Sequence, residues 1–145
     1  MLLFLFRLLS FLPLSVLHAL GRVGGRMVYR FPDKYRERLQ DNARQAGYTN
    51  PAFALESAAQ AGAMIMELPK VWLKNEESLA MVVSDDNHVV EAALAEGRGV
   101  LYLTPHLGCF EITARYLTRH GPITFMFRPP RKPILAPIME SARNA

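Results

Sequence analysis

The sequence predicts an α/β protein in which an N-terminal membrane helix is followed by helices and a partial parallel sheet with flanking helices. Three observations lead to this prediction. The first 20 residues are almost all apolar, the next 50 show helical patterns with start and stop residues, and later short apolar runs alternate with helical segments. The predicted regions are residues 1–22, 23–78 and 79–145, and the sheet of the last region is expected to be truncated.

The N-terminal segment, MLLFLFRLLSFLPLSVLHAL, has about the 20 apolar residues that span a bilayer core. Arg7 lies near its end, from where the side chain can reach the headgroups. Arg22, Arg26 and Arg30 follow it, so the positive-inside rule places the remaining chain in the cytoplasm. No cleavage pattern of a signal peptide follows. The segment is therefore predicted to anchor the chain in a membrane. Spanning the bilayer, lying flat in the interface and forming a buried core helix stay open.

Charge is distributed unevenly along the chain. The net charge is +5 over residues 1–50, −6 over residues 51–97 and +5 over residues 98–145. Basic ends around an acidic middle favour an anionic partner, and the apolar N-terminus favours a membrane over nucleic acid. Cys109 is the single cysteine, so neither an intrachain disulfide nor a zinc site made of thiolates can form.

The middle region contains two predicted helices. The first covers residues 31–48 and stops at Gly47. The second covers residues 50–68, with Asn50 as its cap, and is expected to end at Pro69.

The last region alternates between apolar runs and helical patterns. Strands are predicted over 78–83, 99–104 and 122–127, and helices over 87–97, 108–121 and 134–144. Short buried strands that alternate with helices imply parallel strands joined by right-handed crossovers. Function in such sheets collects at the carboxyl ends of the strands, where Asp85, His106 and Arg128 follow the three predicted strands.

The stretch TPHLGCFEITAR contains the candidate catalytic pair. His106 lies in a predicted strand-to-helix turn, Glu111 lies in the first turn of the helix, and Gly108 permits a sharp bend between them. The carboxylate can reach one imidazole nitrogen and leave the other as a general base. Backbone N–H groups around Gly108 and Cys109, at the start of the helix, favour negative charge. This arrangement suits removal of a hydroxyl proton and stabilisation of a tetrahedral oxyanion.

Two other interpretations of this stretch stay open. Glu111 can simply serve the helix dipole, with His106 as an ordinary turn residue. Cys109 can act as a nucleophile, because a helix N-terminus lowers the pKa of a thiol, or it can pack as a small apolar residue.

Together, LTPHLGCFEI, the later FMFRPPRKP and the preceding LPLSVLHALGRVGG resemble the bacterial lipid A late acyltransferases, which transfer lauroyl or myristoyl chains. The resemblance covers essentially the whole chain, as the N-terminal portion of the family pattern. The family motif reads His-Phe-Gly-Asn-Trp-Glu, whereas this chain has His-Leu-Gly-Cys-Phe-Glu. The resemblance implies a glycerolipid acyltransferase-like fold at the cytoplasmic face of a cell inner membrane.

The resemblance also implies a reaction and its residues. A fatty acyl chain would move from acyl carrier protein to a hydroxyl of a lipid A precursor or a related glycolipid, with His106 as general base and Glu111 as its partner. Arg128 would lie near substrate phosphate or the transition state, and Gly108 and Arg131 complete the expected substrate-binding set. No metal, tightly bound cofactor or nucleic acid is expected.

The sequence departs from the family in two respects. Cysteine and phenylalanine replace asparagine and tryptophan inside the motif, which changes the surroundings of the pair. The family pattern also continues beyond residue 145. The alternative functions are therefore an inactive truncated fragment and a membrane-anchored binding module of the same fold.

Overall fold

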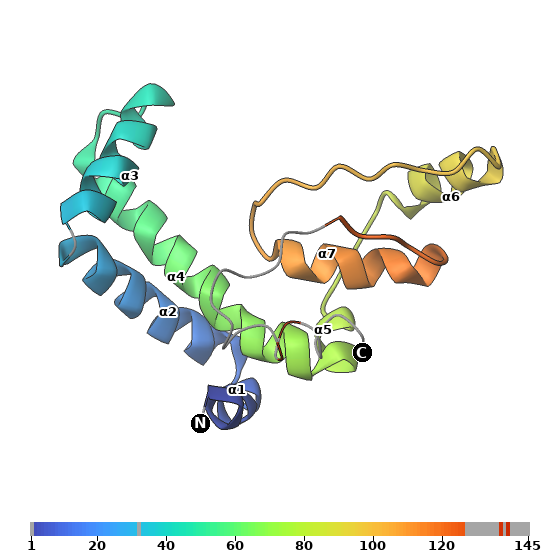
Figure 1. Ribbon diagram of the computed structural model, residues 1–145, viewed down its shortest axis with the longest axis horizontal. Helices are drawn as coiled ribbons and strands as arrows, with labels where there is room; N and C mark the ends of the chain where they lie inside the picture. The colour runs from blue at the N-terminus through green and yellow to red at the C-terminus, as the bar shows by residue number, and fades with distance from the viewer. Residues whose placement is uncertain (1, 32, 127–136, 138, 140–145) are drawn as a thin grey trace. The chain divides into compact units, whose positions relative to one another are not determined.

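The computed structural model describes residues 2–31, 33–126, 137 and 139 (Figure 1). The chain divides into two compact units, residues 1–70 and 71–145. Helices account for all the regular secondary structure in the described ranges. They are α1 (Leu2–Ser10), α2 (Leu14–Arg30), α3 (Asp33–Gln45), α4 (Pro51–Leu73), α5 (Asn75–Leu79), α6 (Asn87–Ala95), α7 (Phe110–Leu117) and the 3₁₀ helix η1 (Thr118–His120).

The apolar N-terminus forms two helices instead of the continuous membrane helix predicted over residues 1–22. Pro13 separates them, because proline disfavours helical backbone at the preceding residue and itself has the extended ψ of 145°. The Pro13 carbonyl then accepts the N–H groups of Val16 and Leu17 and starts α2. Among the described residues, no helix has both the length and the apolar character needed to cross a bilayer. The prediction of one continuous membrane helix over residues 1–22 is therefore wrong, since α1 and α2 divide this segment.

Within the first unit, α2 and α4 lie side by side, and small residues form their contact (Figure 1). A Cβ atom at Gly21 would lie 2.5 Å from the carbonyl oxygen of Gly62, and one at Gly25 would lie 2.1 Å from that of Ala58. Both distances are shorter than real Cβ contacts. The two backbones approach this closely only because glycine has no side chain at these positions.

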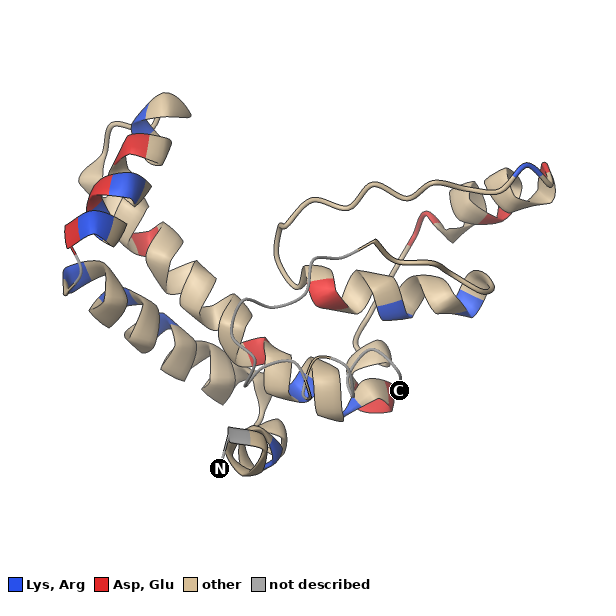
Figure 2. Ribbon diagram, viewed as in Figure 1, with Lys and Arg blue, Asp and Glu red and all other residues tan. Residues whose placement is uncertain are grey.

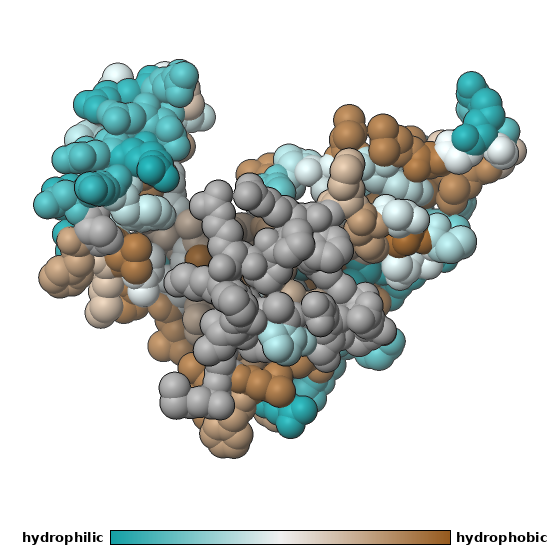
Figure 3. Space-filling view, viewed as in Figure 1, coloured by the Kyte–Doolittle hydropathy of each residue, from teal (hydrophilic) through white to brown (hydrophobic). Residues whose placement is uncertain are grey.

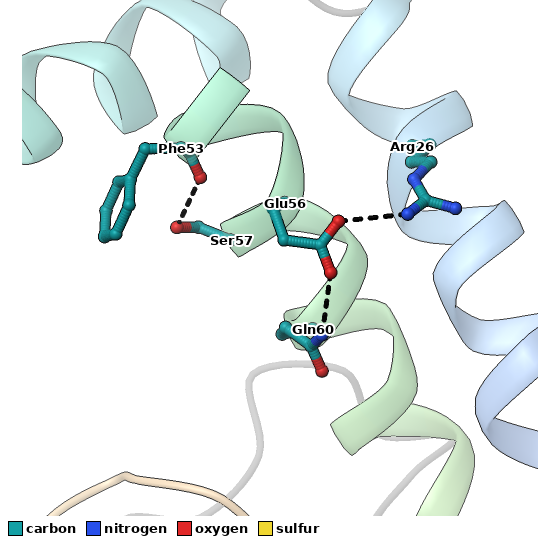
Figure 4. A network of polar contacts seen from close by, with 5 residues as sticks. All are labelled: Arg26, Phe53, Glu56, Ser57 and Gln60. Atoms are coloured by element: carbon teal, nitrogen blue, oxygen red, sulfur yellow. Dashed lines mark hydrogen bonds and ion pairs between the residues drawn. The ribbon is translucent and has the colours of Figure 1, made fainter. Parts of the chain in front are cut away.

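Polar pairs flank this contact on both sides. His18 Nε2 lies 2.6 Å from Glu67 Oε1, and Arg26 Nη2 donates a hydrogen bond of 3.0 Å to Glu56 Oε2. Gln60 donates to the other oxygen of Glu56, as Figure 4 shows. The hydrogen bond from Arg26 is the main cause that lowers the pKa of Glu56 below its ordinary value. These pairs help to fix the position of α2 along α4.

Helix α3 packs against α2 around Tyr29, which is buried with Ala54 and Ala58 of α4. The Tyr29 hydroxyl accepts a hydrogen bond of 2.9 Å from Gln40. The predicted end of α3 is confirmed, because Gly47 has a φ of +89° just after the helix. Its N–H donates to Arg44, while the N–H of Tyr48 donates to Ala43, which together form a Schellman motif.

The predicted start of α4 is confirmed and its predicted end is wrong. The Asn50 side chain accepts the N–H of Ala52 at 2.9 Å, as expected of a helix cap. The helix nevertheless continues past Pro69 to Leu73. Pro69 is fully buried, and Val71 and Trp72 after it are buried as well. Burial of this apolar turn compensates for the backbone hydrogen bond that proline removes.

The predicted partial parallel sheet is wrong, because the described part of the chain contains no strand. Ser78 and Leu79, the start of the first predicted strand, are buried residues of helix α5. Residues 99–104 and 122–126 are irregular, and several of their large apolar side chains are exposed, namely Leu101, Leu103 at 87%, Phe125 and Met126. A strand requires a neighbouring strand for its N–H and C=O groups, and an apolar run by itself does not supply one.

The helices predicted in the second unit are confirmed over α6 and α7. α5 packs against α7, and the Tyr116 hydroxyl of α7 donates a hydrogen bond of 2.7 Å to Asn87 at the start of α6. Gly121, with a φ of +141°, follows η1 as the predicted terminator. The helix predicted over 134–144 lies almost wholly outside the described residues.

Candidate functional site

The turn between His106 and helix α7 is a tight backbone bend. Gly108 has a φ of +57°, which only glycine adopts without cost, although a Cβ there would meet nothing within 4 Å. Cys109 has φ −79° and ψ 62°, and the N–H of Phe110 donates to the Gly108 carbonyl at 3.0 Å. These values define an inverse γ-turn. Glycine is therefore required here for its backbone angle and not for space.

His106 is exposed on this turn. Its ring lies against the ring of Phe110, with 4.3 Å between centroids and an interplanar angle of 36°. The aromatic contact places the imidazole beside the start of α7, and the residue as a whole is exposed.

Glu111 is the second residue of α7 and is half-buried. Its Oε2 accepts a hydrogen bond of 3.1 Å from the indole N–H of Trp72. No hydrogen bond between His106 and Glu111 is found among the described residues. The structure therefore places both residues at the same turn and pairs the carboxylate with Trp72.

Arg115 completes a small polar cluster with Glu111 and Trp72. It lies one helical turn after Glu111, and its Nη2 is 3.5 Å from the Trp72 carbonyl oxygen. Burial lowers the pKa of the Arg115 guanidinium, and the negative charge of Glu111 partly opposes this effect by raising it. Both side chains are half-buried, and the guanidinium and the carboxylate lie near each other at the edge of α7.

Trp72 and Arg115 are not among the residues predicted from the sequence. The spacing of Glu111 and Arg115 is the favourable i, i+4 order of acid and base on a helix, which is a usable sequence signal. Trp72 lies 39 residues before Glu111, and no local pattern connects the two. Only the tertiary contact identifies it.

The remaining predicted residues have different outcomes. Cys109 is the half-buried residue that precedes α7, and no hydrogen bond from its side chain caps the helix. Arg128 and Arg131 lie outside the described residues. In the described part of the chain, no three His, Cys, Asp or Glu residues are placed to hold a metal ion together.

Comparison with known proteins bears on the whole chain. The family described as bacterial lipid A biosynthesis acyltransferase matches residues 1–145. Neither a curated protein nor a solved structure matches the chain. Because the family match covers every residue, including the turn with His106 and Glu111, the chain belongs to the bacterial lipid A biosynthesis acyltransferase family.

Proposed function

We propose that this chain moves a fatty acyl group from acyl carrier protein to a hydroxyl of a lipid A precursor at the cytoplasmic face of the inner membrane. The observation that carries the proposal is the turn at residues 106–111, in a chain whose family is one of lipid A acyltransferases. The turn joins an accessible imidazole, a carboxylate held by Trp72 and the positive end of a helix.

In the proposed reaction, His106 removes the proton from the acceptor hydroxyl as the oxygen attacks the carbonyl carbon of the acyl thioester. The resulting tetrahedral oxyanion is stabilised by backbone N–H groups at the start of α7. When the carbon–sulfur bond breaks, the imidazolium returns the proton to the leaving thiolate. The products are an ester and a free thiol, and His106 ends neutral.

Glu111 is proposed to orient His106 and to stabilise its imidazolium. This role requires the carboxylate to face the imidazole during the reaction, while another residue holds the carboxylate in position. The hydrogen bond from Trp72 to Oε2 fixes the position of the carboxylate at the start of α7, which supports a role in orienting a neighbouring group. The arginines at 128 and 131 are proposed to bind substrate phosphate, where their fixed fork of donors suits that group.

The test is acyl transfer by membranes that contain this chain, with labelled acyl carrier protein and a lipid A precursor. We expect His106→Ala to lower the rate by about 10²- to 10⁴-fold, the usual contribution of a general base. His88→Ala is the matched control, because His88 is an exposed histidine on α6. Equal rates for the His106 and His88 variants would refute the catalytic role. If the unmodified chain binds the lipid without transferring an acyl group, the binding-module alternative is favoured instead.

A further inference from the structure

Residues 99–104, the run GVLYLT that leads to the turn at His106, have no backbone partner in the single chain. No backbone–backbone hydrogen bond joins residues 98–107 to any other described residue. Figure 1 draws this stretch as an open, extended trace between α6 and α7. Its N–H and C=O groups are therefore available for pairing, as those at the edge of a sheet are.

The side chains of this run alternate in exposure. Leu101 and Leu103 are 86% and 87% exposed, whereas Val100 and Tyr102 are half-buried. A period of two is that of extended backbone, so the two leucines lie on one side of the run. Hydrophobic side chains follow the stretch between α6 and α7 in Figure 3. Large apolar side chains that are this exposed at neighbouring positions indicate a surface that a partner covers.

The run lacks the charges that usually protect such a segment from association. Residues 99–105 contain no charged side chain, and Figure 2 shows uncharged residues along the stretch that leads to α7. Arg98, just before the run, is paired with Glu96 of the same chain. Natural edge strands often carry lysines or inward-pointing charges that keep other chains away. Two copies of this run can therefore approach each other without repulsion between like charges.

The run is also complementary to a second copy of itself. In an antiparallel pair, residues that lie directly opposite each other have their side chains on the same face. With Tyr102 opposite Tyr102, Leu101 of each copy lies opposite Leu103 of the other, so that all the leucines of the two runs gather on one face. On the other face, Val100 of each copy lies opposite Thr104. This register satisfies a two-fold axis, which the commonest dimers have.

We propose that two copies of this chain associate by antiparallel pairing of residues 100–104 about a two-fold axis at Tyr102. The single chain has no strand here, so the pairing forms only on association. It would hold the backbone up to two residues before His106 and so fix the approach to the candidate catalytic turn, a consequence that rests on the proposed function. The interface is short, so we expect a dissociation constant in the micromolar to millimolar range. Below it the chain is single and the leucines stay exposed.

The first experiment measures the dissociation constant of the purified full chain by analytical ultracentrifugation in a mild detergent. We expect Leu103→Asp to raise this constant at least about tenfold, because it places a charge on the face where the leucines gather. Val83→Asp is the matched control, since Val83 is an equally exposed apolar residue of the second unit outside the run. Circular dichroism checks that both variants keep their helices. A chain that stays monomeric, or equal constants for the two variants, would overturn the proposal.

The second experiment tests the register by disulfide formation in a Cys109→Ser background. Tyr102→Cys should cross-link rapidly under mild oxidation, because opposed Cβ atoms lie about 4.5–5.5 Å apart. Leu101→Cys should cross-link slowly with itself, since the two copies of this position lie diagonally, about 7–8 Å apart. Mixing it with Leu103→Cys should restore rapid cross-linking. Equally rapid cross-linking of each variant with itself would show parallel, in-register pairing or random collision, and would contradict the proposed register.

Acyl transfer at increasing concentrations of the chain distinguishes this proposal from the proposed function. The rate per chain should rise around the measured dissociation constant, and Leu103→Asp should move this rise to higher concentrations. If the dimer forms as described while transfer dependent on His106 is absent, only the proposed reaction fails. If a chain that stays monomeric still transfers acyl groups, only the dimer proposal fails. If Leu103→Asp weakens binding of a fatty acid to such a monomer, the leucines contact an acyl chain in place of a second copy.

Discussion

The two units of the chain bury their apolar residues very differently. Residues 1–70 contain a close contact of α2 with α4 and a continuous set of buried alanines, with Leu17 and Tyr29. In residues 71–145, the buried apolar side chains of the described part are Val71, Trp72 and Leu79, and neither α6 nor α7 buries a residue. The first unit therefore has the closer packing between helices, and the second unit contains the candidate site on short helices with little buried surface.

This difference indicates where mutations should act. In the first unit, a single added methyl group can meet backbone atoms that are unable to move. In the second unit, most substitutions should change stability little. The exceptions are expected at the turn before α7, which should affect stability, and in the cluster at Glu111, which should affect the reaction rate. The predictions below test this contrast, from the largest expected effect to the smallest.

The strongest effect is expected at the contact between α2 and α4. Gly25→Ala should destabilise the chain by about 3 kcal/mol, because its Cβ would lie 2.1 Å from the Ala58 carbonyl oxygen. Gly24→Ala is the matched control on the next residue, where a Cβ meets nothing within 4 Å. It should stabilise the helix by about 0.5–1 kcal/mol. Thermal unfolding of both variants is the measurement, and changes of the same sign would contradict the described packing.

The turn before α7 should respond to backbone angle alone. Gly108→Ala should destabilise the turn by about 1–2 kcal/mol, because a Cβ is strained at a φ of +57°. Gly108→Asn should cost less, since asparagine visits this conformation more readily. Denaturant unfolding compares the two. If alanine and asparagine have equal effects, the left-handed angle is not the reason for the glycine.

The cluster around Glu111 should affect the rate more than the binding of substrate. Trp72→Phe keeps most of the ring and removes the N–H that bonds Glu111, so kcat should fall about tenfold, equivalent to ~1.4 kcal/mol, with KM little changed. A fall in kcat alone is what a positioning role for Trp72, acting through Glu111, predicts. An unchanged kcat in a folded variant would show that Trp72 only packs.

The exposed apolar residues of the second unit should be nearly neutral in this chain. Leu103→Ser should change the free energy of unfolding by less than about 0.5 kcal/mol, because the side chain is 87% exposed. Denaturant unfolding measures this change. A loss of 2 kcal/mol or more, on the order of a buried leucine, would mean that residues 99–104 pack against a partner.

The smallest effect concerns pH and the pair of Arg26 with Glu56. The pKa of Glu56 is lowered in the folded chain, so its contribution to stability is present above the ordinary pKa of a glutamate and is lost as the pH falls through the lowered value. Glu56 is exposed, so the contribution is small. The unfolding temperatures of the unmodified chain and of Glu56→Gln should become more similar as the pH is lowered from 7 to about 3. A difference that grows as the pH falls would have the wrong sign.

Local signals in the sequence were reliable where a single residue sets a helix boundary. Gly47 ends α3, Asn50 caps α4 and Gly121 follows η1, each as predicted. Local signals failed at two prolines, for opposite reasons. Pro13 divides the N-terminal helix although the apolar run is continuous, while Pro69 stays inside α4 because burial compensates for its missing hydrogen bond.

The candidate site shows the same division. The position of His106 in the turn, the need for Gly108 and the start of α7 near Glu111 could all be predicted, since they depend on neighbours in the sequence. The hydrogen bond of Glu111 to Trp72 could not be predicted, because it joins residues 39 positions apart. The apolar runs were wrongly interpreted as strands, because composition reports hydrophobicity and does not report whether a pairing partner is present.

By itself, the sequence determined the family, the helix boundaries at Gly47 and Asn50, and the residue types at the turn. These features depend on local backbone preferences and on a motif of fixed spacing. The tertiary structure alone decided which face of α2 is buried, which partner holds Glu111 and where the apolar runs lie. Such features depend on contacts between distant segments, and the free energy of those contacts is set by the shape of both partners.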